Sequence, residues 1–201
     1  MLNLIDFIFM VFILLFSITV HEYFHGRAAE LFGDPTPRLS GRLNLNPLSH
    51  IDPVGFLMLI FFRFGWAKPV PINENYFKDP DMDMALVALA GPLSNFLFAV
   101  VIALFYRFIF VYILPDSFFY SFGNLVQYAV FINIALALFN LIPIPPLDGS
   151  RILRAILPYE AQNFIDSIEP FGFLILIFLI FIPGFTQALF FLINHFVNVL
   201  L

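Results

Sequence analysis

The chain has 201 residues, of which 61% are hydrophobic and 11% are charged, and its formal net charge is −5. Soluble domains hold about 45–50% apolar and about 25% charged residues, so this composition excludes a water-soluble fold. The absence of Cys excludes disulfides and thiolate metal sites, and the few Lys and Arg residues form no basic stripe for nucleic acid. The sequence therefore predicts one domain over residues 1–201, embedded in the lipid bilayer.

Residues 4–31 form the first predicted membrane helix, because an apolar run without Pro extends about 42 Å and exceeds the hydrocarbon core of about 30 Å. Residues 33–52 hold several helix breakers, and the alternation of polar and apolar residues at 42–46 predicts a short strand or hairpin. Residues 54–66 are apolar but too short to cross, which favours a re-entrant segment.

The middle of the chain predicts two further spans, at residues 84–106 and 125–141. Between the first and second spans, residues 67–83 form a polar loop, with a short strand expected around 70–72.

The C-terminal part has two apolar stretches, residues 171–182 and 186–200, which form either a short helical hairpin or one kinked helix. The whole pattern predicts an all-α polytopic membrane protein with about 4–6 membrane helices or half-helices. A short β-hairpin or sheet and the re-entrant segment are expected near the active site.

The basic residues predict the orientation of the chain in the membrane. Eight of them fall on one side of the predicted topology: Arg27, Arg38, Arg42, Arg63, Lys68, Lys78, Arg151 and Arg154. Only Arg107 falls on the other side. Cytosolic loops carry the excess of Lys and Arg, so the larger group marks the cytosol and the first helix ends there.

The first helix carries the strongest chemical signal, the H-E-x-x-H motif that begins at His21 and ends at His25. Four-residue spacing puts both imidazoles on one helix face, where they can reach one Zn²⁺, and Glu22 can act as general base. A shuffled chain of this composition would hold about 0.0015 such motifs. The alternative, two membrane histidines satisfied by their neighbours, is disfavoured because ionisable groups inside spans are costly and usually functional.

A catalytic zinc needs a third protein ligand and an open position for water. The candidates are His50, His195 and a carboxylate, and Asp148 is the strongest carboxylate because it follows a membrane helix broken by three prolines. An ordinary turn explains Asp148 and Gly149 when they are taken alone, and helix packing explains His195.

Five segments of the chain resemble the site-2 protease family of intramembrane zinc metalloproteases, peptidase family M50, and especially its small prokaryotic members. They are residues 21–25, 41–47, 50–55, 90–95 and 140–149. The last segment, Asn140 to Gly149 with its three prolines, is far more specific than the histidine motif. No inserted stretch is long enough for a PDZ domain, and the extra N-terminal span of some members is not expected here.

The resemblance implies one Zn²⁺ per chain, held by His21, His25 and Asp148, with Glu22 as general base. It further implies that Asn140 lies near the metal, where its amide would steady a substrate or an oxyanion, and Asn95 could do similar work. Interhelical hydrogen bonding is the alternative role for both amides. The expected substrate is a single-span membrane protein or a signal-peptide remnant, cut in a cell membrane from the cytosolic side.

Two alternative hypotheses about the function assign different roles to these residues. In another class of membrane metalloprotease the third ligand would be Glu160 or Glu169. A zinc carrier or sensor would use the same ligands without needing Glu22 as a base.

Overall fold

The structure is a computed structural model, and it describes residues 4–62, 65–112 and 116–201. Its α-helices are α1 (Leu4–Leu31), α2 (Thr36–Leu39), α3 (Pro53–Phe62), α4 (Pro80–Tyr112), α5 (Asp116–Asn140), α6 (Asp148–Ile156), α7 (Tyr159–Ile168), α8 (Gly172–Ile180) and α9 (Pro183–Leu200). Between them, the described residues form three short 3₁₀ helices: η1 (Pro47–His50), η2 (Glu74–Tyr76) and η3 (Glu169–Phe171).

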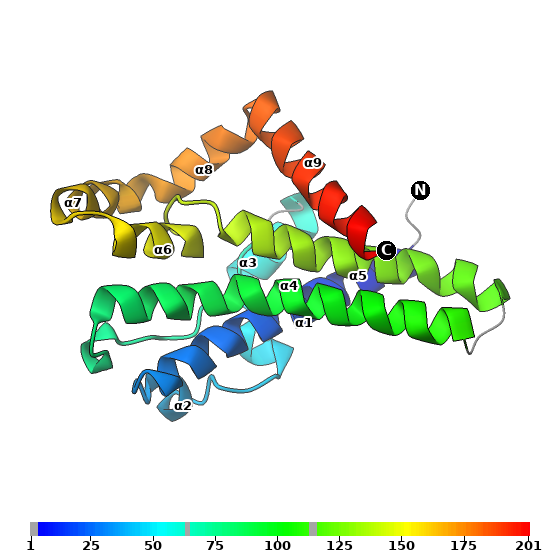
Figure 1. Ribbon diagram of the computed structural model, residues 1–201, viewed down its shortest axis with the longest axis horizontal. Helices are drawn as coiled ribbons and strands as arrows, with labels where there is room; N and C mark the ends of the chain where they lie inside the picture. The colour runs from blue at the N-terminus through cyan, green and yellow to red at the C-terminus, as the bar shows by residue number, and fades with distance from the viewer. Residues whose placement is uncertain (1–3, 63–64, 113–115) are drawn as a thin grey trace.

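Helices α1, α4 and α5 are the long elements of the molecule and lie side by side, with α4 packed against both of the others (Figure 1). Small side chains on α4, including Ala99 and Ala103, are fully buried against Val130 and Ile134 of α5. Small residues let membrane helices approach closely, which explains this tight pairing.

Within the described residues, four segments are long and apolar enough to cross a membrane: Phe7–Leu31, Pro80–Ile109, Gly123–Asn140 and Tyr159–Ile180. The first three correspond to the three predicted spans. Helix α3 has only ten residues, so it is too short to cross, as its sequence predicted. The all-α polytopic membrane fold is therefore confirmed.

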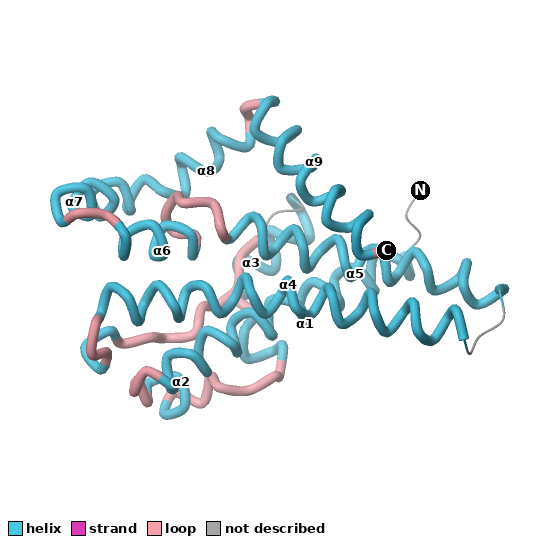
Figure 2. Tube along the Cα trace, in the orientation of Figure 1, coloured by secondary structure: helices cyan, strands magenta, loops and turns pink. Residues whose placement is uncertain are grey.

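The predicted hairpin within residues 33–52 is not confirmed. Residues 4–62, 65–112 and 116–201 contain no strand, only one antiparallel bridge between Ile51 and Ala67 (Figure 2). Asn side chains take the backbone donors that a ladder would need: Asn44 Oδ1 accepts from the Asn46 N–H at 2.9 Å, and Asn46 Oδ1 accepts from the Leu48 N–H at 3.1 Å. Such local turns compete with strand pairing, so the alternating pattern at residues 42–46 does not produce the predicted hairpin.

The two C-terminal apolar stretches are separate helices that meet in a V (Figure 1). Pro183 occupies the first turn of α9, where its missing N–H costs no helical hydrogen bond. Helix α9 turns back and packs on α5, with Ile193 and Val197 buried. The alternative of one kinked helix is thus excluded.

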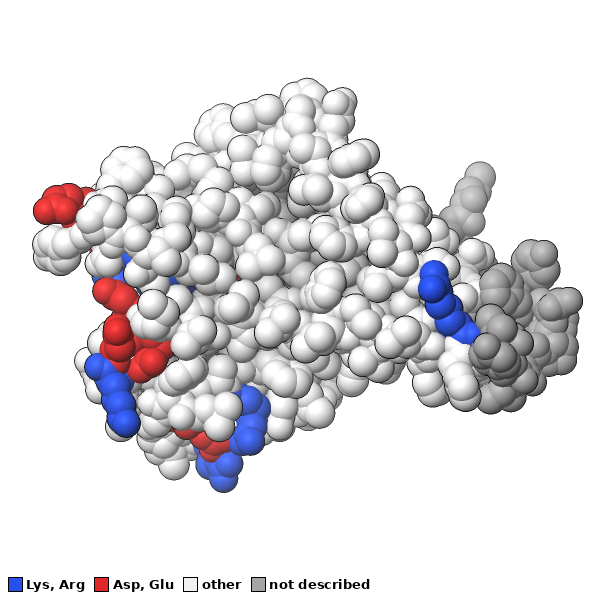
Figure 3. Space-filling model, viewed as in Figure 1, with Lys and Arg blue, Asp and Glu red and all other residues white. Residues whose placement is uncertain are grey.

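Charged side chains gather at the end of the molecule that holds α2, α6 and α7, and the middle of this face shows none among the described residues (Figure 3). Arg107 lies in the last third of α4, near the opposite end. Arg63, one of the eight basic residues grouped above, lies outside the described residues. The cytosolic assignment of the charged end stays a prediction.

Candidate metal centre

Three side chains from two distant segments converge beside the first half of α4. His21 and His25 of α1 bring their Nε2 atoms to 2.9 Å from each other. Asp148, the first residue of α6, places Oδ2 at 3.1 Å from His21 Nε2 and Oδ1 at 3.4 Å from His25 Nε2. Both imidazoles are buried. The three predicted ligands therefore form one cluster in space, although more than a hundred residues separate His25 from Asp148 in the chain.

The chain between Asn140 and Asp148 explains how the carboxylate reaches the histidines. Helix α5 ends at Asn140, and the prolines that follow cannot continue it. The backbone folds back so tightly that a Cβ at Gly149 would collide with the carbonyl oxygens of Leu141 and Ile142. Helix α6 then packs on α4, and Arg154 pairs with Asp81 of α4. These contacts hold the first turn of α6, and so Asp148, against the imidazoles.

The rear nitrogens of the two imidazoles face hydrogen-bond acceptors. His21 Nδ1 lies 2.6 Å from Asn95 Oδ1, and His25 Nδ1 lies 2.7 Å from the Val87 carbonyl oxygen. The Asn95 amide nitrogen donates to the Ser17 carbonyl oxygen at 3.1 Å, so its oxygen is the atom that faces His21. Both Nδ1 atoms therefore carry hydrogen, and the Nε2 atom of each neutral ring presents its lone pair.

The front of the cluster consists of acceptors that need a cation. Two Nε2 lone pairs and a carboxylate point at one another, and Asp148 Oδ2 is buried with no hydrogen-bond donor among the described residues. Such an arrangement is repulsive unless positive charge lies between the groups. Two imidazoles and one carboxylate are a donor set that suits Zn²⁺ and leave a fourth position open. The residues thus fit the metal.

Gly91 of α4 forms the floor beneath the imidazoles. A Cβ built on it would lie 2.7 Å from His21 Cε1 and would also collide with the His25 ring. Only the absence of a side chain there lets the rings come together over α4.

Glu22 stands next to the cluster and lines the same space. Its Oε2 accepts from the Val70 N–H at 2.8 Å. A polar cavity of about 340 Å³ opens here, and its lining includes His21, Glu22, His25, Asn140, Asp148, Arg151 and Val70. Asn140 donates from its amide to the Leu136 carbonyl oxygen at 3.0 Å, at the rim of this cavity.

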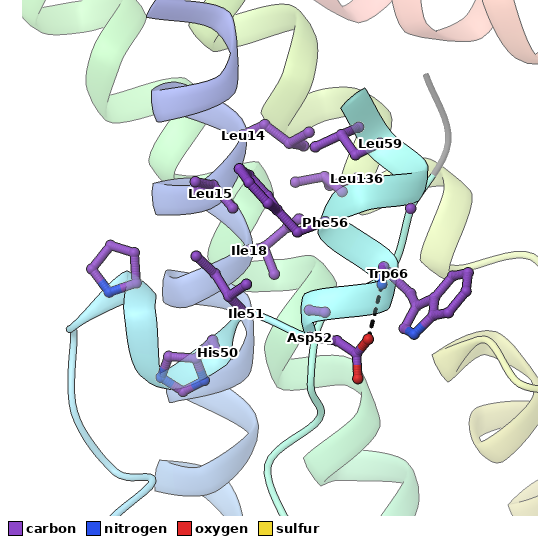
Figure 4. A pocket seen from close by; sticks show the side chains of 14 residues that line it. Leu14, Leu15, Ile18, His50, Ile51, Asp52, Phe56, Leu59, Trp66 and Leu136 are labelled. Carbon is purple, nitrogen blue, oxygen red and sulfur yellow. Dashed lines mark hydrogen bonds between the residues drawn. The ribbon is translucent and has the colours of Figure 1, made fainter. Parts of the chain in front are cut away.

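A second cavity, of about 250 Å³, lies on the other side of Glu22 and is mainly apolar. It shares His21, Glu22, Asn140 and Pro146 with the polar cavity and extends to Phe173, Leu176 and Ile177 of α8. A side pocket of about 130 Å³ adjoins it, between α1 and α3; Leu14, Ile18, Phe56 and Leu59 point into it (Figure 4). The cluster therefore sits where polar and apolar spaces meet.

The rival ligands lie elsewhere. His50 is buried in η1 beside the side pocket and directs Nε2 to the Asn44 carbonyl oxygen at 3.0 Å (Figure 4). His195 stacks on Phe191 in α9. Glu169 pairs with Arg151 at 2.8 Å, and Glu160 is exposed. Within the described residues, His21, His25 and Asp148 are the one group that could hold a metal.

Asn95 lies behind His21 rather than in the cavity, with no exposed surface and both ends of its amide engaged. Sequence reasoning missed three further parts of the site: the Asn133 side chain, the Val87 carbonyl and the floor at Gly91. A polar residue in an apolar helix was the available signal for Asn133. Nothing in a single sequence points to a main-chain carbonyl.

Comparisons with known proteins agree with this geometry. Residues 108–183 match the model of "Peptidase family M50". The chain is 36% identical over 177 residues to "Putative zinc metalloprotease YwhC" of Bacillus subtilis, covering 87% of this chain and 81% of the relative. It is 29% identical over 188 residues to "Putative zinc metalloprotease Rip2" of Mycolicibacterium smegmatis, covering 90% and 70% of the two chains.

A shorter match, 32% identical over 103 residues, joins it to "Putative zinc metalloprotease MJ0611" of Methanocaldococcus jannaschii and covers 50% of this chain and 49% of the relative. No solved structure matches this chain closely enough to count as a relative. The family match, the similarity to the Bacillus subtilis relative over most of both chains, and the two-histidine, one-aspartate cluster agree. The chain belongs to the site-2 protease family of zinc metalloproteases, peptidase family M50.

Proposed function

We propose that the protein is an intramembrane zinc endopeptidase that hydrolyses peptide bonds of membrane-spanning substrates. His21, His25 and Asp148 hold the metal, and Glu22 is the general base. The observation that carries the proposal is the convergence of three acceptors on one point, beside the Glu22 carboxylate, which lines the same cavity. His25 and His21 lie six and ten residues before Leu31, or about 9 and 15 Å inside the end of α1.

When bound, zinc supplies a Lewis acid that polarises the scissile carbonyl and acidifies the attacking water. Glu22 takes the proton of that water on its carboxylate and later delivers it to the leaving amine nitrogen, as the C–N bond breaks. The Val70 N–H donates to Glu22 Oε2 and so orients the carboxylate beside the cluster. The Asn140 amide, at the rim of both cavities, steadies the substrate carbonyl or the oxyanion that forms from it.

The two cavities suggest how a substrate lies across the site. Its apolar residues occupy the apolar cavity toward α8, and its polar residues and the attacking water occupy the polar cavity beside Arg151. The scissile bond then falls at the boundary between an apolar and a polar segment. A single-span membrane protein or a signal-peptide remnant has such a boundary. The Lys and Arg side chains at the end of the molecule that holds α2, α6 and α7, with Arg151 in the lining of the polar cavity, support an opening to the cytosol.

A helical substrate must unwind before its carbonyls become available, because helical hydrogen bonds occupy them. Residues 70–72 are the segment proposed to hold the unwound chain, because local turns occupy backbone donors within residues 42–46. The backbone beside the site at Val70 already directs its N–H to Glu22, so pairing there would use neighbouring carbonyls. Photocrosslinking from position 72 tests this step, and failure to capture substrate there would count against it.

Cleavage of a panel of single-span substrates by wild-type protein and by Glu22→Gln tests the proposed function. The variant should keep one zinc per chain and lose cleavage. A zinc carrier or sensor, the alternative function, would keep transport or sensing in Glu22→Gln and show no cleavage in either protein.

A further inference from the structure

A closed polar network lies behind His21, in the dry interior between the three long helices. It consists of Ser17 from α1, Asn95 from α4 and Asn133 from α5, and all three side chains have no exposed surface. The mechanism proposed above uses none of them directly. Since the bilayer core supplies no water, every donor and acceptor here must find its partner within the protein.

The hydrogen bonds of this network have only one consistent direction. Asn133 donates both amide hydrogens, to the Ala129 carbonyl oxygen at 2.9 Å and to Ser17 Oγ at 2.9 Å. A carbonyl oxygen only accepts, so the Asn133 amide cannot be reversed. Its oxygen must then face Asn95, whose nitrogen donates to it at 3.0 Å.

The direction of these hydrogen bonds also fixes how the Asn95 amide faces His21. The Asn95 nitrogen gives its second hydrogen to the Ser17 carbonyl oxygen at 3.1 Å. The Asn95 oxygen is left to accept from His21 Nδ1 at 2.6 Å. Reversal of the Asn95 amide would face its nitrogen toward His21 and favour the ring form with hydrogen on Nε2, the nitrogen that must bind the metal.

We propose that Asn133 and Ser17 are positioning residues for the zinc site. They hold the Asn95 amide with its oxygen toward His21, which keeps the ring hydrogen on Nδ1 and leaves Nε2 free for the metal. This inference rests on the proposed zinc-ligand role of His21. His25 needs no such device, because a main-chain carbonyl, that of Val87, backs it.

The test compares zinc binding and ring state in four full-length variants with wild type. Asn133→Leu removes the acceptor for Asn95 and both donors. Asn133→Asp keeps a side-chain oxygen that can accept from Asn95. Ser17→Ala removes only the hydroxyl. Ile134→Ala, one residue along α5, creates a cavity in the separate core against α4 and α9 and serves as the packing control.

Zinc affinity is measured by competition with a chromogenic chelator, and the tautomers of His21 and His25 by nitrogen-15 NMR of metal-free protein. Asn133→Leu should weaken zinc binding about 10–100-fold, as loss of outer partners does elsewhere. It should also shift His21 toward hydrogen on Nε2 while His25 stays unchanged. Ser17→Ala should have a smaller effect, Asn133→Asp should restore most of the affinity, and Ile134→Ala should lower only the melting temperature.

Wild-type zinc affinity and an unchanged His21 ring in Asn133→Leu would overturn the inference. Equal zinc loss in Ile134→Ala would also overturn it, because the effect would then be one of packing. If wild-type protein bound no zinc, the proposed function would fail by itself, and the metal-free tautomers would still decide whether the network sets the His21 ring.

Discussion

The two sides of the histidine pair differ in how their polar atoms are satisfied. Behind the rings, each nitrogen meets an acceptor at 2.6–2.7 Å. In front, two ring nitrogens and the Asp148 carboxylate face one another, and Asp148 Oδ2 has no hydrogen-bond donor among the described residues. A network that only joined helices would be closed on both sides. The difference teaches that the rear contacts organise the rings, and that the front is built for a cation.

The two histidines also differ from each other. His25 is backed by a main-chain carbonyl that no side-chain substitution removes, whereas His21 depends on a chain of amides from two other helices. Substitutions away from the metal ligands can therefore change the tautomer and orientation of the His21 ring.

The largest expected effect is that of Glu22→Gln on cleavage. Loss of the proposed general base should lower kcat about 10²–10⁴-fold, while zinc binding stays near wild type because Glu22 is not among the three converging side chains. Cleavage assays and zinc analysis on the same samples measure both quantities. Glu74→Gln, which also lines the polar cavity, is the matched control and should leave kcat within a few-fold. Loss of zinc in Glu22→Gln would mean that this carboxylate is itself a ligand.

Removal of the front carboxylate should abolish metal retention. Asp148→Ala should weaken zinc binding more than about 100-fold, since outer partners alone are worth about 10–100-fold and a direct ligand is worth more. Chelator competition measures the change. Glu160→Ala and Glu169→Ala should bind zinc like wild type, because neither side chain reaches the histidines. The opposite ranking would favour the other class of membrane metalloprotease.

Loss of the amide at the rim should separate catalysis from metal binding. Asn140→Ala should lower kcat about 100-fold if the amide stabilises the oxyanion, the lower end for such donors, with zinc affinity unchanged. Steady-state kinetics against one single-span substrate measures kcat and KM. An unchanged kcat would leave Asn140 with its hydrogen bond to the Leu136 carbonyl and no role in the reaction.

A methyl group on the floor should push the rings apart. Gly91→Ala places a Cβ within collision distance of both imidazoles, so zinc affinity should fall on the order of 10–100-fold through displacement of the ligands. Chelator competition again gives the change. Gly184→Ala is the control, because a Cβ there meets no atom within 4 Å. Wild-type zinc affinity in Gly91→Ala would contradict this prediction, because the rings would then tolerate a Cβ at position 91.

Local pattern explains which parts of the fold could be predicted. The three long spans follow from apolar length, and the short α3 from an apolar run of limited extent. The predicted hairpin was wrong because Asn44 and Asn46 form side-chain turns that an alternating pattern does not reveal. The choice between a hairpin and a kinked helix at the C-terminus needed the packing of α9 on α5.

The sequence alone determined the membrane class, the pairing of His21 and His25 on one helix face, and Glu22 beside them. These depend on spacing along a single helix, which the chain carries locally. Tertiary structure decided that Asp148, rather than His50 or His195, completes the cluster, and that Asn95, Asn133 and the Val87 carbonyl hold the rings. Those contacts join residues from 38 to 127 positions apart, and helix packing, which no local pattern encodes, brings them together.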